Sequence, residues 1–335
     1  MYVDPKLVPS RTLANGCKIP CLGLGTFGSD RYDAQTIASA VEGAIHSGYR
    51  LIDCTSCYGN EAEIGEVLAR VEAQGVVKRE ELFVISKLWN DKHAKNEVLL
   101  SCAQTLHDLR LEYLDAYFVH WPFRNYHAPH CDGDSRNPDS TPFSLEKFME
   151  TWRRFERLYT MGLVRNLGMS NMTIPKLEAV LPLCKIRPTM IELELHPSFQ
   201  QPELFAYLQA HKIQPVGFCP IGSPRRPDRD VFAGDVVDTQ MPSVVAAARA
   251  HGVHPAAICL KWSAQRGAIP IPFSTTPEHY VENLRCVTQD PLSQAEIDAI
   301  AQDDRNCRLV KGQVFLWPGA TDWRDLWDIH GEITR

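Results

Sequence analysis

The chain has 335 residues, of which 44% are hydrophobic, and its formal net charge at pH 7 is −6. Its Lys and Arg residues are scattered and form no basic block, which argues against nucleic acid as a partner. No apolar run reaches the roughly 18 residues of a membrane span, and no signal-peptide pattern starts the chain, so we expect a cytoplasmic protein that does not bind membranes. A small molecule is the expected partner, and the expected state is a monomer or a small homo-oligomer.

The first predicted elements are a hairpin and a strand within residues 10–28. Asn15-Gly16 lies between two short extended runs, and both residues accept the positive φ of a tight hairpin turn. Eight apolar runs rich in β-branched and aromatic residues each predict a strand: 21–27, 49–54, 82–89, 114–121, 164–171, 189–195, 215–222 and 268–275. Stretches of helical period alternate with them, for example 34–48, 96–109 and 145–162.

This alternation, with no linker and no change of composition, predicts a (β/α)8 TIM barrel in a single domain over residues 1–335. A doubly wound sheet is the alternative. Two long irregular stretches interrupt the pattern, namely the loop 122–143 after the fourth strand and the C-terminal tail 303–335. Long loops are usually functional, and loops that follow barrel strands lie on the catalytic face. We therefore expect both stretches near the active site.

Four titratable residues lie at the ends of three consecutive predicted strands. Asp53 ends the second strand and Tyr58 follows it, while Lys87 and His120 end the third and fourth strands. Each has an ordinary alternative: a packed loop aromatic for Tyr58, a surface lysine for Lys87 and a core histidine for His120. Because strand ends converge on one face of a barrel, their joint occurrence predicts a shared pocket.

These four residue types together suit proton transfer to a carbonyl oxygen as a hydride reaches the carbon, or the reverse. A free tyrosine has a pKa of about 10, so we expect the ammonium of Lys87 to lower the pKa of Tyr58 while Asp53 fixes the ammonium. The imidazole of His120 can donate a hydrogen bond to the substrate oxygen and orient it.

Seven segments of the sequence carry a resemblance to a known family: LGLGTF (22–27), LIDCTSCYGNEAEIG (51–65), VISKLW (84–89), FVHWP (118–122), GLVRNLGMSN (162–171), ELHP (194–197) and PIGSP (220–224). In order and spacing they resemble the aldo-keto reductases. The resemblance implies an Asp, Tyr, Lys, His tetrad on the barrel. In it, Tyr58 would be the general acid or base, Lys87 and Asp53 its tuning pair, and His120 the orienting group.

The resemblance also implies a nicotinamide dinucleotide as cofactor. Ser170 and Asn171 would hold the nicotinamide carboxamide, and Phe218 would replace the usual tyrosine that stacks on the ring. The implied cofactor-binding residues are Gly25, Thr26, Phe27, Asp53, Ser170, Asn171, Glu192, Phe218, Pro220, Ile221, Gly222, Ser223, Arg225, Phe273, Ser274, Thr275, His279, Glu282 and Asn283.

Glu192 departs from the family, which usually has a glutamine there in contact with the carboxamide. An ionised Glu192 would stabilise the oxidised ring relative to the reduced one by about 1–4 kcal/mol, which favours oxidation of an alcohol. Alternatively, Glu192 is protonated or turned toward a nearby cation and replaces the glutamine as a hydrogen-bond partner.

A second departure concerns the 2′-phosphate of NADP. Relatives that prefer NADP usually carry a lysine and an arginine where this chain has Phe273 and His279. With two fixed cations missing, we predict NAD as the cofactor, with NADP as the alternative. Arg225 stands where an acidic residue is common, and its charge could supply a phosphate contact.

The predicted substrate pocket lies under the loop 122–143. Its expected residues are Phe27, Trp89, Trp121, Arg124, Asn125, His127 and His130. Polar groups of these kinds favour a sugar-like or polyol-like substrate. Although His120, His127, His130 and Cys131 are all possible zinc ligands, His120 is assigned to catalysis and the others to the pocket rim, so no metal site is expected.

The main prediction is an NAD(P)-dependent oxidoreductase, with two alternatives. The same barrel can serve as a cofactor-binding regulatory subunit with little turnover, or as an isomerase or aldolase that uses Lys87 as a Schiff base. Cys54 and Cys57 form a C-x-x-C, but neither a helix N-terminus nor a second cysteine pair accompanies them. We interpret both as packing residues.

Overall fold

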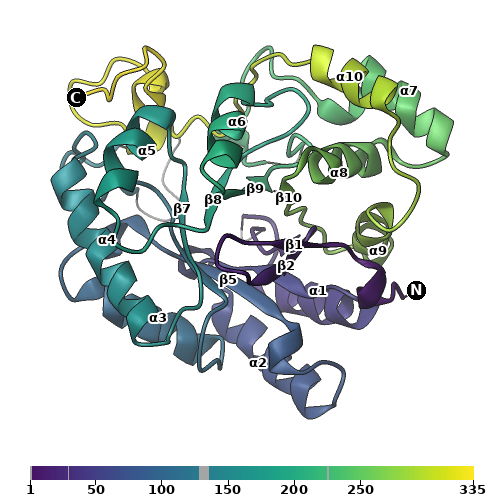
Figure 1. Ribbon diagram of the computed structural model, residues 1–335, viewed down its shortest axis with the longest axis horizontal. Helices are drawn as coiled ribbons and strands as arrows, with labels where there is room; N and C mark the ends of the chain where they lie inside the picture. The colour runs from purple at the N-terminus through teal and green to yellow at the C-terminus, as the bar shows by residue number, and fades with distance from the viewer. Residues whose placement is uncertain (1, 29, 128–135, 225) are drawn as a thin grey trace.

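The protein is described here by a computed structural model, which covers residues 2–28, 30–127, 136–224 and 226–335. Eight parallel strands form one sheet in chain order, and helices surround it (Figure 1). The strands are β3 (Leu24–Gly25), β4 (Leu51–Asp53), β5 (Phe83–Leu88), β6 (Ala116–Val119), β7 (Leu167–Ser170), β8 (Met190–Glu194), β9 (Gln214–Phe218) and β10 (Ile269–Pro270). Each overlaps one of the eight predicted runs, and the predicted (β/α)8 barrel is confirmed.

The barrel closes between its first and last strands. The N–H of Gly23 donates to the carbonyl oxygen of Pro270 at 3.1 Å, and the N–H of Gly25 donates to that of Pro272 at 2.9 Å. Larger residues would crowd both neighbours of β3, since a Cβ on Gly23 would lie 2.6 Å from Cγ of Leu51 in β4, and one on Gly25 would lie 3.3 Å from the carbonyl oxygen of Ile271 next to β10. The glycines of LGLG therefore allow β3 to pack closely against the strands on both sides.

Ten α-helices occur in the described part of the chain. They are α1 (Ala34–Ser47), α2 (Glu61–Ala73), α3 (Glu97–Asp108), α4 (Leu145–Thr160), α5 (Ile174–Val180), α6 (Pro202–Ala210), α7 (Pro242–His251), α8 (Pro255–Arg266), α9 (Pro277–Cys286) and α10 (Gln294–Gln302). Two of them, α7 and α8, stand between β9 and β10, and α7 packs with α10 beside the barrel. None of these helices has both the length and the apolar composition needed to cross a membrane.

A hairpin covers the end of the barrel at which the strands begin. Its strands β1 (Ser10–Thr12) and β2 (Lys18–Pro20) pair antiparallel around the Asn15-Gly16 turn. Leu13 and Ile19 are buried in one cluster with side chains of the barrel strands. The opposite end, where the strands finish, stays available for a site.

The C-terminal tail, yellow in Figure 1, is held against the barrel by a buried ion pair and an aromatic cluster. The ammonium of Lys176 in α5 pairs with Asp328, and each side chain is at most 2% exposed. The cluster joins the tail to the loop after β6, and its aromatic members are Trp121, Phe123, Phe315, Trp317 and Trp327. These contacts place the tail beside that loop.

A buried chain of charges links the end of β8, the loop after β9 and the tail. Nε2 of His196 lies 3.0 Å from Oε1 of Glu194, and Nδ1 lies 2.8 Å from Oδ2 of Asp238, with none of the three side chains exposed. Glu194 also accepts hydrogen bonds from the N–H groups of Leu309 and Val310, at 2.6 and 2.9 Å. Burial alone lowers the pKa of His196, but Asp238 and Glu194 together raise it to about 9. The ring is therefore an imidazolium at neutral pH.

Candidate active site

The predicted tetrad gathers at the end of the barrel where the strands finish. Asp53 ends β4, Lys87 lies in β5, and His120 follows β6 directly. Nζ of Lys87 is 2.6 and 2.7 Å from the two carboxylate oxygens of Asp53, and the lysine side chain is fully buried. Tyr58 ends a short 3-10 turn after β4, with its ring 6.0 Å from Nζ of Lys87 and 6.3 Å from the His120 ring.

The electrostatics of the tetrad differ in one respect from the prediction. Burial raises the pKa of Tyr58 well above its usual value, and the opposing effect of Lys87 is smaller. Desolvation of the buried phenolate thus exceeds its attraction to the ammonium, so Tyr58 is a neutral phenol at neutral pH. Burial, assisted by Lys87, holds the pKa of His120 well below its usual range, and its imidazole is neutral too.

Glu192 adds a second carboxylate beside the same ammonium. Its Oε2 lies 3.3 Å from Nζ of Lys87, and its side chain is 4% exposed. Burial and the nearby charge of Asp53 raise the pKa of Glu192 to about 8, while Lys87 acts in the opposite direction. Burial alone would lower the pKa of Lys87, yet Asp53, Glu192 and Tyr58 raise it. Lys87 is therefore always charged in the working pH range.

Two buried oxygen atoms beside the tetrad accept no well-formed hydrogen bond from the described residues, although one of them belongs to the ion pair with Lys87. They are Oδ1 of Asn171 and Oε2 of Glu192. The backbones of the two residues are joined, since the N–H of Asn171 donates to the carbonyl oxygen of Glu192 at 3.0 Å. A carboxamide group carries two N–H donors, so these acceptors fit the nicotinamide carboxamide that was predicted here. Ser170 Oγ already donates to the Glu192 carbonyl oxygen at 3.1 Å.

The loop after β3 brings a ring next to the tetrad. Phe27 is 41% exposed, and its ring centroid lies 5.1 Å from that of Tyr58. Thr26 is fully buried and donates its hydroxyl to the carbonyl oxygen of Asp53 at 2.8 Å. Phe27 therefore offers an apolar surface to a ligand, whereas Thr26 and Gly25 support the backbone under it.

The predicted pyrophosphate loop follows β9. Phe218 is the half-buried last residue of β9, and Pro220, Ile221, Gly222 and Ser223 come after it. Gly222 has φ of +71°, and a Cβ there would lie 2.9 Å from Cγ of Asp238. The turn is thus pressed against the buried chain of charges. Arg225 lies outside the described residues.

The predicted adenosine end lies around β10 and α9. His279, Glu282 and Asn283 are spaced three and four residues apart, which places them on one face of α9. Ser274 and Thr275, both half-buried, precede that helix. Phe273 packs over Gly28, where a Cβ would come within 2.6 Å of its ring, and contacts the edge of the Tyr32 ring. An apolar ring occupies the place of the family's lysine.

The predicted substrate residues divide into two groups. The ring centroid of Trp89 lies 5.1 Å from that of His120 and 6.5 Å from that of His127, so Trp89 forms one side of the site around the tetrad. In contrast, Trp121 is buried in the aromatic cluster of the tail. Asn125 is 2% exposed and donates to the carbonyl oxygens of Thr141 and Phe315, both at 2.8 Å. Trp121 and Asn125 therefore connect the loop after β6 to the C-terminal tail and do not line the substrate pocket as predicted.

One pocket residue was missed by the sequence analysis. Phe315 lies 6.0 Å from Trp89 and 5.6 Å from His127, measured between ring centroids. The sequence offered Trp317 and Trp323 as pocket walls, with packing as the ordinary alternative, and both pack in the aromatic cluster of the tail. Nothing in the local sequence distinguishes Phe315 from these tail aromatics. Arg124 is exposed after β6, and His130 lies outside the described residues.

The C-x-x-C forms neither a disulfide nor a metal site with the described residues. Cys54 and Cys57 are both free thiols, and Sγ of Cys57 lies 3.9 Å from Nδ1 of His120. Cys54 is buried, as expected for a packing residue, but Cys57 is exposed, so its interpretation as a packing residue is wrong. Within the described ranges, no three His, Cys, Asp or Glu side chains are arranged to hold a metal ion. His130 and Cys131 lie outside those ranges, so the absence of a metal stays a prediction.

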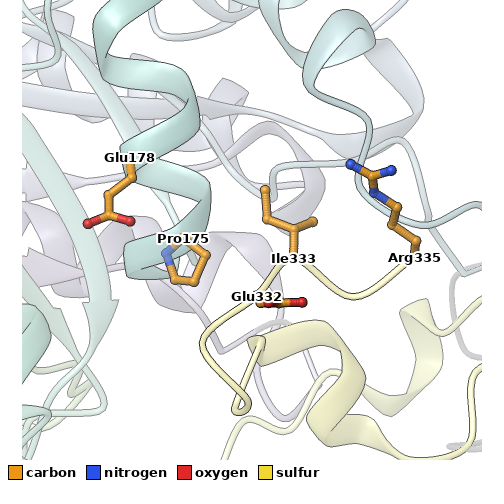
Figure 2. Close-up of a pocket in the computed structure, with 5 residues that line it drawn as sticks. All are labelled: Pro175, Glu178, Glu332, Ile333 and Arg335. Atoms are coloured by element: carbon orange, nitrogen blue, oxygen red, sulfur yellow. The ribbon is translucent and has the colours of Figure 1, made fainter.

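A separate pocket lies between α5 and the last residues of the tail (Figure 2). It is lined by Pro175, Glu178, Glu332, Ile333 and Arg335. It includes none of the predicted site residues. This pocket is therefore not part of the candidate active site.

Comparison with known proteins agrees with the fold. The model of the family described as "Aldo/keto reductase family" matches residues 21–304. An aldo/keto reductase of Synechocystis, slr0942, is 38% identical over 94% of this chain and 95% of its own, and aldo-keto reductase family 1 member A1 of Bos taurus is 40% identical over 89% and 90%. The structure of a Bombyx mori aldo-keto reductase, solved in complex with NADP, superposes with a TM-score of 0.80 at 30% identity, over 92% of this chain and 96% of that one. The chain therefore belongs to the aldo/keto reductase family of oxidoreductases.

Proposed function

We propose that the protein interconverts an alcohol and a carbonyl compound by hydride transfer with a nicotinamide dinucleotide. One observation carries the proposal: the fully buried Lys87, held by Asp53 at 2.6 Å, lies beside Tyr58 and His120 at the carboxyl ends of the strands. Asn171 and Glu192 would hold the carboxamide of the cofactor. When bound, that cofactor supplies or accepts the hydride.

Residues of the protein would donate and accept the proton of the reaction. In the reducing direction, the neutral phenol of Tyr58 gives its proton to the carbonyl oxygen, and the ammonium of Lys87 stabilises the phenolate that remains. The neutral imidazole of His120 donates a hydrogen bond to the same oxygen and orients the substrate. In the oxidising direction, the proton returns to Tyr58.

We propose NAD as the preferred dinucleotide, with NADP as the alternative. Phe273 packs over Gly28, and His279 on α9 stands where the family's arginine is usual. Neither side chain supplies a fixed cation for a 2′-phosphate. The Bombyx mori reductase was solved with NADP, so the two dinucleotides must be compared directly in this protein.

Replacing Phe273 by Lys together with His279 by Arg should tighten NADP binding by at least about 100-fold, because hydrogen bonds between charged groups contribute about 1.5–3 kcal/mol each. Binding of NAD should change little. Titrations of each dinucleotide, followed by protein fluorescence, measure both dissociation constants. The matched control is Phe273→Met with His279→Gln, which removes the same side chains without adding charge. Tighter binding of NADP than NAD by the native protein would contradict the proposed preference.

We propose a sugar-like or polyol-like substrate. The exposed guanidinium of Arg124 and the imidazole of His127 give the pocket rim polar groups, and Trp89 gives it a flat wall. An ionised Glu192 would also favour oxidation of the alcohol. The cytoplasmic location, the monomeric or small homo-oligomeric state and the single domain over residues 1–335 stay predictions from the sequence.

A substrate screen tests the proposed function. Sugars, polyols and simple aldehydes are mixed with each dinucleotide, and the absorbance of the reduced nicotinamide is followed. We expect turnover with at least one hydroxyl-rich compound. Tight cofactor binding without turnover on any compound would favour a regulatory subunit, and a substrate adduct on Lys87 trapped by borohydride would favour an aldolase.

A further inference from the structure

Two carboxylates share one ammonium in the candidate active site. Lys87 Nζ lies 2.6 Å from Asp53 and 3.3 Å from Glu192, and all three side chains are at most 7% exposed. If both carboxylates were ionised, this buried group would carry a net charge of −1. An uncompensated buried charge is costly, so either a proton or a cation from elsewhere should neutralise it.

Glu192 is the carboxylate that is free to change its charge. Both oxygens of Asp53 accept hydrogen bonds from the ammonium within 2.7 Å, whereas Glu192 contacts the ammonium only through the longer 3.3 Å ion pair of its Oε2. The titratable groups that face Glu192 are Asp53, Lys87 and Tyr58, and its strand neighbours contribute the backbone of Ser170 and Asn171 and the apolar Val216. With a pKa of about 8, Glu192 is mostly protonated at pH 7 in the free protein.

The redox state of a nicotinamide changes the charge beside Glu192. The oxidised ring is a cation, and it would neutralise an ionised Glu192 so that the buried group sums to zero. The reduced ring is neutral, and the group then reaches zero only when Glu192 carries a proton. The two redox forms of the cofactor therefore favour opposite protonation states of one side chain.

We propose that Glu192 is a proton-exchanging residue linked to the redox state of the cofactor: it loses its proton when the oxidised dinucleotide binds and keeps it when the reduced one binds. Alcohol oxidation then converts the oxidised ring and ionised Glu192 into the reduced ring and protonated Glu192. The hydride of the substrate goes to the ring, its hydroxyl proton goes to the phenolate of Tyr58, and Glu192 takes up one proton from solvent. The inference rests on the proposed function, because it needs the nicotinamide to lie beside Glu192 and Asn171.

Calorimetric titrations in buffers of different ionisation enthalpy count the protons released on binding. With NAD at pH 7, the native protein should release close to one proton per site, since the group starts about nine-tenths protonated. With NADH it should release almost none. Glu192→Gln should release none with either form. Because binding releases a proton, the affinity of the native protein for NAD should rise with pH, by up to about tenfold for each pH unit, until the pH reaches about 8. The affinity of Glu192→Gln should not depend on pH in this range.

Two further variants separate Glu192 from its neighbours. Glu61 is another buried carboxylate, which accepts hydrogen bonds from Ser86 and Thr105, and Glu61→Gln should release protons as the native protein does. Tyr58→Phe should also keep the release. Equal proton release by the native protein and Glu192→Gln, with both binding the dinucleotide, would overturn the inference and leave the proposed function standing. Failure of every dinucleotide to bind would instead overturn the proposed function and the inference with it.

Discussion

Replacing Tyr58 by Phe should lower the turnover number by about 10²–10⁴-fold, the usual contribution of a positioned general acid or base. The substitution removes only the hydroxyl, so Phe27 keeps its ring contact, now with a phenyl group, and Lys87 stays paired with Asp53. Dinucleotide affinity should change little, because the substitution leaves Asn171 and Glu192, the proposed carboxamide acceptors, in place. Steady-state kinetics and a binding titration on the same preparation measure both quantities.

The control for this prediction is Tyr113→Phe. Tyr113 stacks between Arg79 and Arg165, near the start of β6 and far along the barrel from the tetrad. Its loss of a hydroxyl should leave turnover unchanged. A Tyr58→Phe protein with near-native turnover would contradict the assignment of Tyr58 as the proton-exchanging group.

The free energy of unfolding should fall by about 3 kcal/mol from the titration of His196 as the pH rises from 6.5 to 9. The folded-state pKa of this ring is about 9, against about 6.5 in an unfolded chain. Since the folded pKa is the higher one, the stabilisation is complete below pH 6.5 and is lost as the pH rises through 9. Equilibrium unfolding in denaturant at several pH values measures the slope.

The measurement compares the native protein with His196→Gln. Glu192 and the buried thiols contribute their own slopes to both proteins, so the difference between the two reports the imidazolium together with the carboxylates that it pairs with. The variant should be less stable than the native protein at pH 6.5, and the gap should narrow toward pH 9. A gap that does not change with pH would show that Glu194 and Asp238 do not hold a charged ring between them.

The fold could be predicted from sequence because each strand carries its signal locally. Runs such as 82–89 and 114–121 are apolar and rich in β-branched and aromatic residues, so each predicts a strand from its own composition. Because strand ends converge on one face of a barrel, this also predicts that Asp53, Lys87 and His120 lie together. The segments that resemble the family fixed the same residues independently. The family model and the structural comparison confirm both the fold and the family.

The features that could not be predicted from the sequence depend on contacts between residues far apart in the chain. Asn125 looks like a polar rim residue, but its amide is engaged by the backbone of Phe315, which is 190 positions away. The ion pair between His196 and Asp238, which lies in the loop after β9, also has no signal in the sequence pattern. The pKa of Tyr58 was predicted to fall, because the attraction of Lys87 was counted without the larger cost of burying a phenolate.

Glu192 shows how a single departure can be sharpened by geometry. The sequence left two interpretations open, an ionised carboxylate that favours the oxidised ring and a neutral one that replaces the glutamine. Glu192 pairs with Lys87 only at 3.3 Å, while Asp53 holds the same ammonium at 2.6 Å, so both charge states are accessible to Glu192. In the linkage proposed above, the two interpretations describe the two redox forms of the complex.

The most direct test of hydride transfer follows an isotope. A carbonyl substrate identified in the screen is reduced with a dinucleotide that carries two deuterium atoms at C4 of its reduced nicotinamide, and the product is analysed by mass spectrometry and NMR. We predict one deuterium on the carbon that bore the carbonyl oxygen, and we expect Tyr58→Phe to form this product about 10²–10⁴-fold more slowly than the native protein. A product without deuterium at that carbon, or no product despite a bound dinucleotide, would contradict the account.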